Sequence, residues 1–147
     1  MSYSTGEALL LTRVQACTGF DSNNTSRCNW KILNKGKSDH YAILRPGAFN
    51  IEWHALSAYT ANWTTVVEVW QRYKDDTTSQ TNLYGHITNL MAIMAYPYLG
   101  DDTTVVDSSI EGADEPEEMW TQGGGPGWIR WKLRVIWQEQ TEVTFSE

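Results

Sequence analysis

The feature that most constrains the fold is a long alternation of apolar and polar residues over positions 128–143. One set of alternate positions is apolar: Ile129, Trp131, Leu133, Val135 and Trp137. The other set carries three basic side chains followed by an apolar one: Arg130, Lys132, Arg134 and Ile136. A period of two residues is typical of a strand with one face on a core and the other toward solvent or a partner. The segment therefore predicts a long strand in a sheet that is covered on one face.

Residues 63–73 predict a second strand, because they are rich in β-branched and aromatic side chains that suit a pleated surface. Apolar residues occupy both of its alternating faces, which favours a central position in the sheet. Shorter strands are predicted at 40–45, stopped by Pro46-Gly47, at 49–54 and at 103–110. The intervening segments 19–39, 55–62 and 111–118 are predicted as loops.

Two helices are predicted, each with a capping box at its start. Ser4 and Glu7 have this spacing before a helix over 5–17, and Thr77 and Gln80 have it before a helix over 78–95. The second helix carries the best apolar stripe of the chain: Leu83, Ile87, Leu90, Met91 and Met94. Together these elements predict one α+β domain over 1–147, with an antiparallel or mixed sheet of four to five strands and two helices packed on one face.

Composition narrows the class of protein. No apolar run approaches the roughly 20 residues of a membrane span, so we expect no membrane partner. No signal peptide is apparent, which favours synthesis in the cytoplasm. Cys17 and Cys28 are the only cysteines. We expect them to be reduced thiols, because two cysteines form no disulfide framework.

Charge is distributed unevenly along the chain. Residues 1–74 hold eight Lys or Arg and five acids, whereas residues 75–129 hold ten acids and no Lys or Arg. A phosphate-binding stripe is therefore disfavoured over the middle third. The candidate acidic segment consists of Asp101, Asp102, Asp107, Glu111, Asp114, Glu115, Glu117 and Glu118. It could be a solvated loop, line the channel of a ring, or pair with the basic row Arg130, Lys132 and Arg134 of a neighbouring copy.

The sequence offers no set of residues with catalytic or metal-ligand spacing. His40, His54 and His86 are isolated from one another, and each suits a structural role better than a metal ligand. The glycine-rich run at 123–127 lacks the Lys-Ser/Thr of a phosphate loop. We therefore expect no enzymatic activity, no cofactor and no metal.

Eight tryptophans are unusual for 147 residues. Trp131 and Trp137 share the core face of the last predicted strand, so we expect them to be buried. Trp30, Trp53 and Trp120 lie in predicted loops or in a short strand, which leaves them free for binding. An exposed Trp can stack on a sugar ring or form a protein–protein hot spot.

The order of predicted elements resembles that of the tail terminator proteins of long-tailed bacteriophages, also called tail completion or minor tail proteins. The resemblance covers residues 4–143: a capped helix, an interruption at Pro46-Gly47, the 63–73 strand, the second helix and the closing strand. It rests on element order, length and strand character, and it includes no signature motif. The long loop at 19–39 and the acidic and glycine-rich insertion at 111–127 depart from the family pattern.

The resemblance implies a virion protein of the tail neck, whose copies form a ring, usually a hexamer. Such a ring stops polymerisation at the head-proximal end of the tail tube and docks the tail to the head. Its expected partners are other copies of itself, the tail tube protein and a head–tail connector or stopper protein. DNA passes through the centre without base readout. The alternatives are another neck or tail-tube component and, from a different class, a Trp-rich carbohydrate-binding module.

Overall fold

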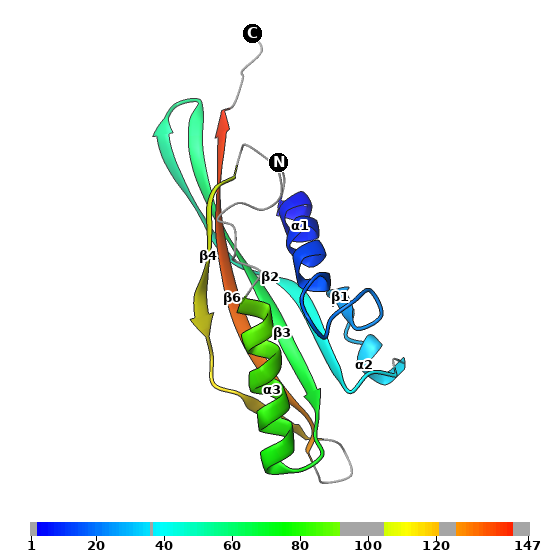
Figure 1. Cartoon of the computed structure of the whole chain (residues 1–147). Helices are drawn as coiled ribbons and strands as arrows, with labels where there is room; N and C mark the ends of the chain where they lie inside the picture. Colours follow the sequence, from blue (N-terminus) through cyan, green and yellow to red (C-terminus); the bar gives the residue numbers. More distant parts are fainter. Residues whose placement is uncertain (1–2, 36, 92–104, 121–125, 143–147) are drawn as a thin grey trace.

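The computed structural model describes residues 3–35, 37–91, 105–120 and 126–142. Figure 1 shows a long twisted sheet with helices beside it. In chain order the elements are α1 (Tyr3–Gln15), β1 (Thr25–Arg27), α2 (Ile32–Lys35), β2 (His40–Ala55), β3 (Ala58–Arg72), α3 (Asp76–Leu90), β4 (Val105–Ala113), β5 (Glu117–Trp120) and β6 (Pro126–Glu142).

The strands form one mixed sheet in the order β1-β2-β3-β6-β4, and β5 pairs with the start of β6. β1 runs parallel to β2, and every other described pair is antiparallel. The α+β class is confirmed, as are the central place of β3 and the long closing strand. The expected strand count of four to five was too low, since the described sheet has six strands. The short β1 and α2 both lie within the predicted loop 19–39, so the expected count of two helices was also too low.

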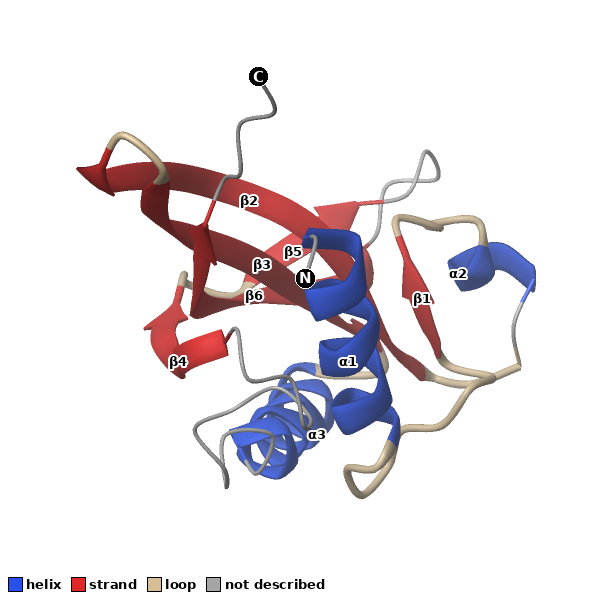
Figure 2. Cartoon of the chain, turned by 90° about the horizontal axis from the view of Figure 1, so that it is seen from above, coloured by secondary structure: helices blue, strands red, loops and turns tan. Residues whose placement is uncertain are grey.

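The main core lies on one face of the sheet, where α1 and α3 both pack (Figure 2). Its fully buried residues include Leu10 and Val14 from α1, and Leu83 and Leu90 from α3. The expected core face of β6 also lies here, with Trp137 almost wholly buried. The prediction that both helices pack on one face is therefore confirmed. A smaller cluster covers the opposite face: Leu33, Tyr41, Ile43 and Trp70.

Neither helix begins with the predicted capping box. Ser4 lies inside α1. Glu7 is a buried residue of the same helix, and its carboxylate accepts hydrogen bonds from Tyr3 and Arg27 at 2.6 Å each. The start of α3 is capped instead by Asp75, whose Oδ1 accepts the Thr78 N–H at 2.7 Å. Glu7 is thus held by a partner that the fold brings near, Arg27, whereas α3 uses a different local cap from the predicted one.

The predicted helix over 78–95 corresponds to α3, which begins two residues earlier and is described as far as Leu90. Leu83 and Leu90 of its apolar stripe are buried, and Ile87 packs against the same core. Met91 is 58% exposed, so the stripe leaves the core there. Met94 lies outside the described residues.

The prediction that Pro46-Gly47 stops a strand was wrong. β2 continues through it by a register shift between Pro46 and Phe49, an irregularity of the β-bulge type that absorbs extra residues without ending the pairing. The predicted loop 55–62 was also wrong, because β3 begins at Ala58 and pairs with both β2 and β6 from there. β2 and β3 therefore form a single long hairpin with a tight turn at residues 56–57.

The predicted loop 111–118 is largely strand. β4 extends to Ala113, and β5 begins at Glu117, so only residues 114–116 connect them. Both strands pair with β6, with Glu117 opposite Arg130 and Gly112 opposite Arg134. This arrangement brings part of the acidic segment directly beside the basic row.

Candidate assembly surfaces

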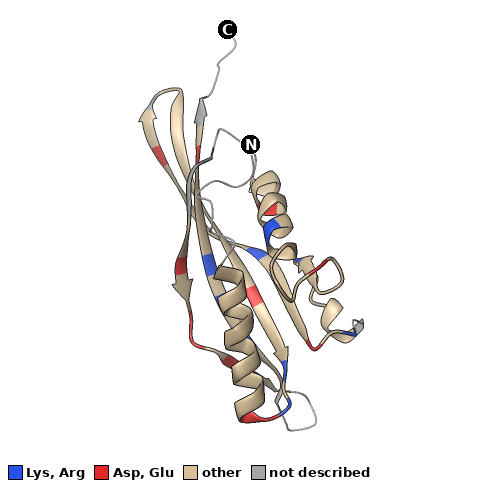
Figure 3. Ribbon diagram, in the orientation of Figure 1, with Lys and Arg blue, Asp and Glu red and all other residues tan. Residues whose placement is uncertain are grey.

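The basic row of β6 forms ion pairs with acidic residues of its own chain. Figure 3 shows basic and acidic positions along the strands. Arg130 Nη2 lies 2.7 Å from Glu117 Oε2, and Lys132 Nζ lies 3.3 Å from the other oxygen of that carboxylate. The hydrogen bond from Arg130 lowers the pKa of Glu117 below its ordinary value, and Lys132 adds to the effect. Because Glu117 is partly exposed, each pair contributes at most about 1 kcal/mol to stability.

Arg134 completes this surface. It forms an ion pair with Asp114, and its Nε lies 3.8 Å from Glu111 Oε2. The sequence suggested a neighbouring copy as the source of acids for the basic row. The structure instead supplies them from positions 13 to 23 residues earlier in the same chain.

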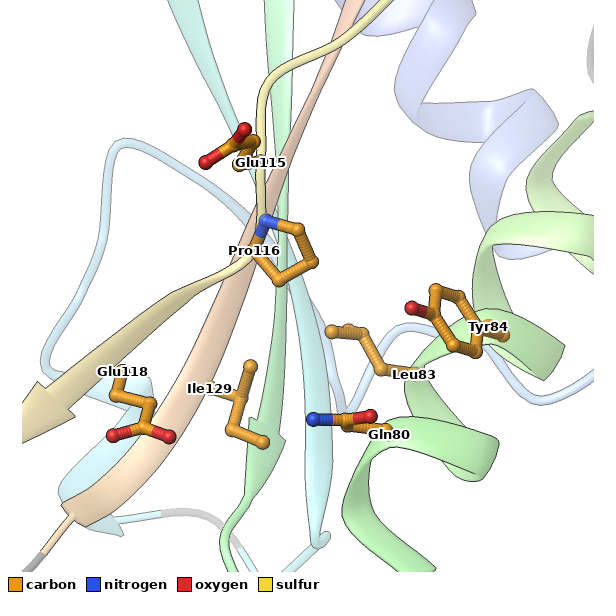
Figure 4. Close-up of a pocket in the computed structure, with 7 residues that line it drawn as sticks. All are labelled: Gln80, Leu83, Tyr84, Glu115, Pro116, Glu118 and Ile129. Atoms are coloured by element: carbon orange, nitrogen blue, oxygen red, sulfur yellow. The ribbon is translucent and has the colours of Figure 1, made fainter. Parts of the chain in front are cut away.

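The other acidic candidates stand apart from the basic row. Glu115 and Glu118 form no ion pair within the described part of the chain, and both are exposed. They flank an open cleft of about 280 Å³ between α3 and the 115–118 segment, whose floor includes Leu83 and Ile129 (Figure 4). Asp101 and Asp102 lie outside the described residues, and nothing is described of the side chain of Asp107. Glu115 and Glu118 therefore remain as the candidates for a channel lining.

A buried carboxylate, Glu68 of β3, lies under the same sheet face and was not predicted. It is 2% exposed, and its Oε2 lies 2.5 Å from Arg45 Nε and 4.0 Å from Arg130 Nη1. Its Oε1 accepts the indole N–H groups of Trp30 at 2.7 Å and Trp70 at 3.2 Å. Several donors thus compensate the burial of one charge. The only sequence signal is a lone acid inside an otherwise apolar strand.

The tryptophans divide between core and surface. Trp137 is buried and Trp131 packs against the main core, as predicted. Trp30 is only partly free, because its N–H is bound to Glu68. Trp53 is exposed, and nothing is described of the side chain of Trp120. Trp53 is therefore the clearest Trp available to a partner.

The hairpin arm, residues 49–63, is the half of the β2–β3 hairpin that reaches beyond α1 (Figure 1). It carries four large, exposed apolar side chains: Phe49 at 59%, Ile51 at 45%, Trp53 at 58% and Leu56 at 93%. These residues leave apolar surface on the order of 500 Å², which is the size of a functional patch on a monomer. Of these four residues, only Leu56 lies in the predicted loop 55–62; the other three lie in the predicted strand 49–54.

A pair of histidines joins α3 to the start of β2. The rings of His40 and His86 stack with centroids 4.0 Å apart, and His86 Nε2 lies 3.0 Å from Gln71 Oε1. Burial, together with the neighbouring His40, lowers the pKa of His86 to about 4. The Gly19 carbonyl lies 2.6 Å from His40 Nε2, so the pair also holds the end of the first loop. This geometry suits a structural contact.

Other sites are limited among the described residues. No three His, Cys, Asp or Glu side chains converge there as a metal site would need. Every helix in the described ranges is too short or too polar to cross a bilayer. Cys17 and Cys28 are free thiols, and Cys28 is exposed.

Comparison with known proteins returned no relative. No protein-family model matches the chain, and no curated protein matches it. The function is therefore inferred from the surfaces described above.

Proposed function

We propose that the protein is a structural subunit of a ring that closes the head-proximal end of a bacteriophage tail tube and docks the tail to the head connector. The observation that carries the proposal is the hairpin arm, which presents Phe49, Ile51, Trp53 and Leu56 to the outside. A patch of this size suits protein–protein contact, and Trp is enriched at interface hot spots.

The element order also supports this function. A helix, a long strand pair, a second helix and closing strands follow one another as in the tail terminator proteins that the sequence resembles. On this proposal the protein is a virion component of the tail neck, with a mechanical role and no catalytic one. Its partners are further copies of itself, the tail tube protein and a connector or stopper protein.

The acidic residues suit the channel of such a ring. Duplex DNA carries about one negative charge per 1.7 Å of its axis, so inward basic residues would retain it. Glu115 and Glu118, free of ion pairs within the described residues, would repel the duplex and let it slide. The basic row already forms ion pairs with the other described acids of the segment, Glu111, Asp114 and Glu117.

Electron microscopy tests the ring directly. Purified protein, alone and mixed with tail tubes that lack their head-proximal end, is expected to give closed rings, or rings at one end of the tubes. Tubes that bind no protein, together with a free protein that forms no ring, would refute the function. Another neck or tail-tube component is indicated if the protein binds along the tube or at its distal end.

The carbohydrate-binding alternative has its own test. A glycan titration followed by tryptophan fluorescence would shift the emission of Trp53 if sugars stack on it. The ring function predicts no shift. A sugar-dependent shift from a protein that stays monomeric would favour the binding module.

The channel lining is tested separately by the double substitution Glu115→Lys and Glu118→Lys. Assembled particles with impaired DNA passage are expected if these residues face the channel. The matched control is Asp76→Lys, which reverses the charge of an exposed acid in the first turn of α3 that does not line the cleft. Normal DNA delivery by the double variant would contradict the channel placement and leave a solvated surface.

A further inference from the structure

The direction of the backbone hydrogen-bonding groups can be followed along β2. Residues of an antiparallel strand alternate between those that bond to one neighbour and those that point to the other side. The Ala42 N–H and the Leu44 carbonyl bond to the segment 24–28 at 3.0 and 2.9 Å, so these residues point away from β3. They lie opposite Val69 and Val67. Odd-numbered residues of β3 are therefore the ones that form no hydrogen bonds with β2.

The same alternation continues into the hairpin arm. Phe49, Ile51 and Trp53 again lie opposite odd-numbered residues of β3, after the bulge has restored the register. Their backbone N–H and carbonyl groups consequently point away from β3, toward the side of β2 on which β1 lies. β1 pairs only with Ala42–Leu44, and no other described strand lies on the outer side of β2, away from β3. Within the described chain, three consecutive outward positions are thus unpaired.

The unpaired edge coincides with the exposed apolar surface. Phe49, Ile51 and Trp53 also carry the large exposed side chains of the arm. Natural proteins usually protect a free edge with Lys, Pro or inward charges. Residues 49–53 contain no Lys and no Pro, and Glu52 is the one charged residue among them. An edge of this kind accepts an added strand, with backbone bonds for affinity and side chains for specificity.

Among the described residues, the opposite side of the sheet ends in a second free edge, that of β4. The Asp114 N–H donates to the Lys132 carbonyl at 3.1 Å, so even-numbered residues of β6 point toward β4. Ile110 lies opposite the odd-numbered Val135 and therefore points its own backbone groups outward. Its side chain packs on the main core, which is the sheet face that the arm's apolar side chains share.

The two edges lie at the same position along the strands, and their strand directions suit antiparallel pairing. Their apolar side chains also lie on the same sheet face. Phe49, Trp63, Trp137 and Ser108 are successive neighbours in one row across the sheet. Each step along β2, β3, β6 and β4 is antiparallel. A second copy placed beside the first in the same orientation would therefore set its β2 antiparallel to the first copy's β4.

We propose that the outer edge of β2 at residues 49–53 pairs with the outer edge of β4 at residues 107–110 in the next copy, so that the sheet continues from subunit to subunit. The contact joins two different surfaces, and repetition of such a contact gives a ring when the rotation closes. The short regular stretch of β4, between its two bulges, sets the length of the pairing. The inference deepens the ring function proposed above and rests on it for closure.

The first test removes one outward N–H. Proline at an edge position whose N–H faces outward loses no bond to the partner strand within its own sheet. Ile51→Pro is therefore expected to preserve the fold of the monomer and to raise the dissociation constant of self-association about tenfold or more. Ile51→Thr is the matched control, because it keeps a β-branched side chain and the N–H. Analytical ultracentrifugation over a concentration series measures both, and circular dichroism confirms folding.

The second test needs no proline. In a Cys17→Ser, Cys28→Ser background, one batch of protein carries Ile51→Cys and another carries Ile110→Cys or Ser108→Cys. Opposed residues that bond to each other across an antiparallel pair have Cα atoms about 5.5 Å apart, which permits a disulfide. Mixing the batches under mild oxidation is expected to join position 51 to position 108 or 110, as peptide mass spectrometry would show.

The outcomes separate this inference from the ring function. A 51–51 disulfide as the main product overturns it in favour of a twofold dimer, and a strictly monomeric protein without cross-links overturns it too. Rings that persist in Ile51→Pro also overturn it, while the ring function stands. Cross-links between 51 and 108 or 110 support the edge pairing even if the protein never binds a tail tube.

Discussion

The two halves of the β2–β3 hairpin are built from the same pair of strands but lie in opposite environments. In the first half, four consecutive residues of β2, Tyr41–Leu44, are fully buried between the helices and the smaller cluster. In the hairpin arm, Phe49, Ile51 and Trp53 remain about half exposed. Both halves have similar apolar content, so composition alone does not explain the difference.

The difference arises from what lies beside each half. β1 pairs with the first half, and α1 and α3 pack over it, whereas the described helices do not reach the tip of the arm (Figure 1). Full burial of a large apolar side chain contributes about 1.5–3 kcal/mol. In the first half this contribution stabilises the monomer, and in the arm, on our proposal, it would stabilise the contact with a partner. Substitutions should therefore affect stability in one half and association in the other.

The largest effect is expected at Glu68, at the centre of the first half. Glu68→Ala leaves the Arg45 guanidinium and two indole N–H groups without their acceptor, and should lower the free energy of unfolding by about 3–5 kcal/mol. Urea denaturation measures the loss. Glu117→Gln is the control, since a half-exposed pair should change stability by at most about 1 kcal/mol. Equal losses in both variants would contradict the special role of burial.

The next effect is expected in α3. Leu90→Ala removes a fully buried side chain and should cost about 2–5 kcal/mol by chemical denaturation. Thr81→Ala, on the exposed side of the same helix, should stay within about 0.5 kcal/mol of the wild type. A cost for Leu90→Ala as small as the control would mean that the apolar stripe is an assembly face.

A smaller effect concerns pH. The pKa of His86 is about 4 in the fold and about 6.5 when unfolded, so the unfolded chain binds more protons between these values. Stability is therefore full above pH 6.5 and falls as the pH drops toward 4. After allowance for the part-exposed ring, we expect a loss of roughly 1–2 kcal/mol. Denaturation at pH 7 and 4.5 should show a smaller loss in His86→Gln than in the wild type. Identical losses would exclude His86 as the source.

The smallest effect on stability is expected in the arm. Trp53→Ala removes a side chain that is more than half exposed, so the free energy of unfolding of the dilute monomer should change by only about 0.5 kcal/mol. Self-association should weaken in the same variant, as sedimentation over a concentration series would show. If Trp53→Ala destabilised the monomer as strongly as Leu90→Ala, the two halves of the hairpin would not differ in the way proposed.

The sequence predicted the elements whose side chains follow a single period. The alternation from Ile129 to Trp137 predicted β6 and its core face, and the stripe of α3 was correct through Leu90. The hairpin arm was predicted only in part. A strand was expected at 49–54, but residues 55–62 were assigned to a loop because their polar and apolar side chains do not alternate regularly. Pro46-Gly47 was misread because a bulge tolerates proline where a regular central strand does not.

The candidate surfaces were harder to predict than the elements. The basic row and the acidic segment were both identified, but their pairing depends on the register of β4 and β5 against β6, which local sequence does not encode. Glu68 gave almost no signal, because its partners come from a loop and two other strands. Long-range pairing is thus the information that the sequence pattern lacked.

The position of β6 has a consequence for how the chain is made. β6 is the last described element, yet it lies between β3 and β4 and supplies Ile129, Leu133, Val135 and Trp137 to the core. During synthesis, one edge of β3 and the apolar faces of α1 and α3 remain exposed until residues 126–142 leave the ribosome. Pairing across such sequence distances is slow and leaves nascent chains prone to aggregation. Production at low temperature or with a chaperone should therefore raise the soluble yield, and stalled chains ending before β6 should be substrates for cellular proteases.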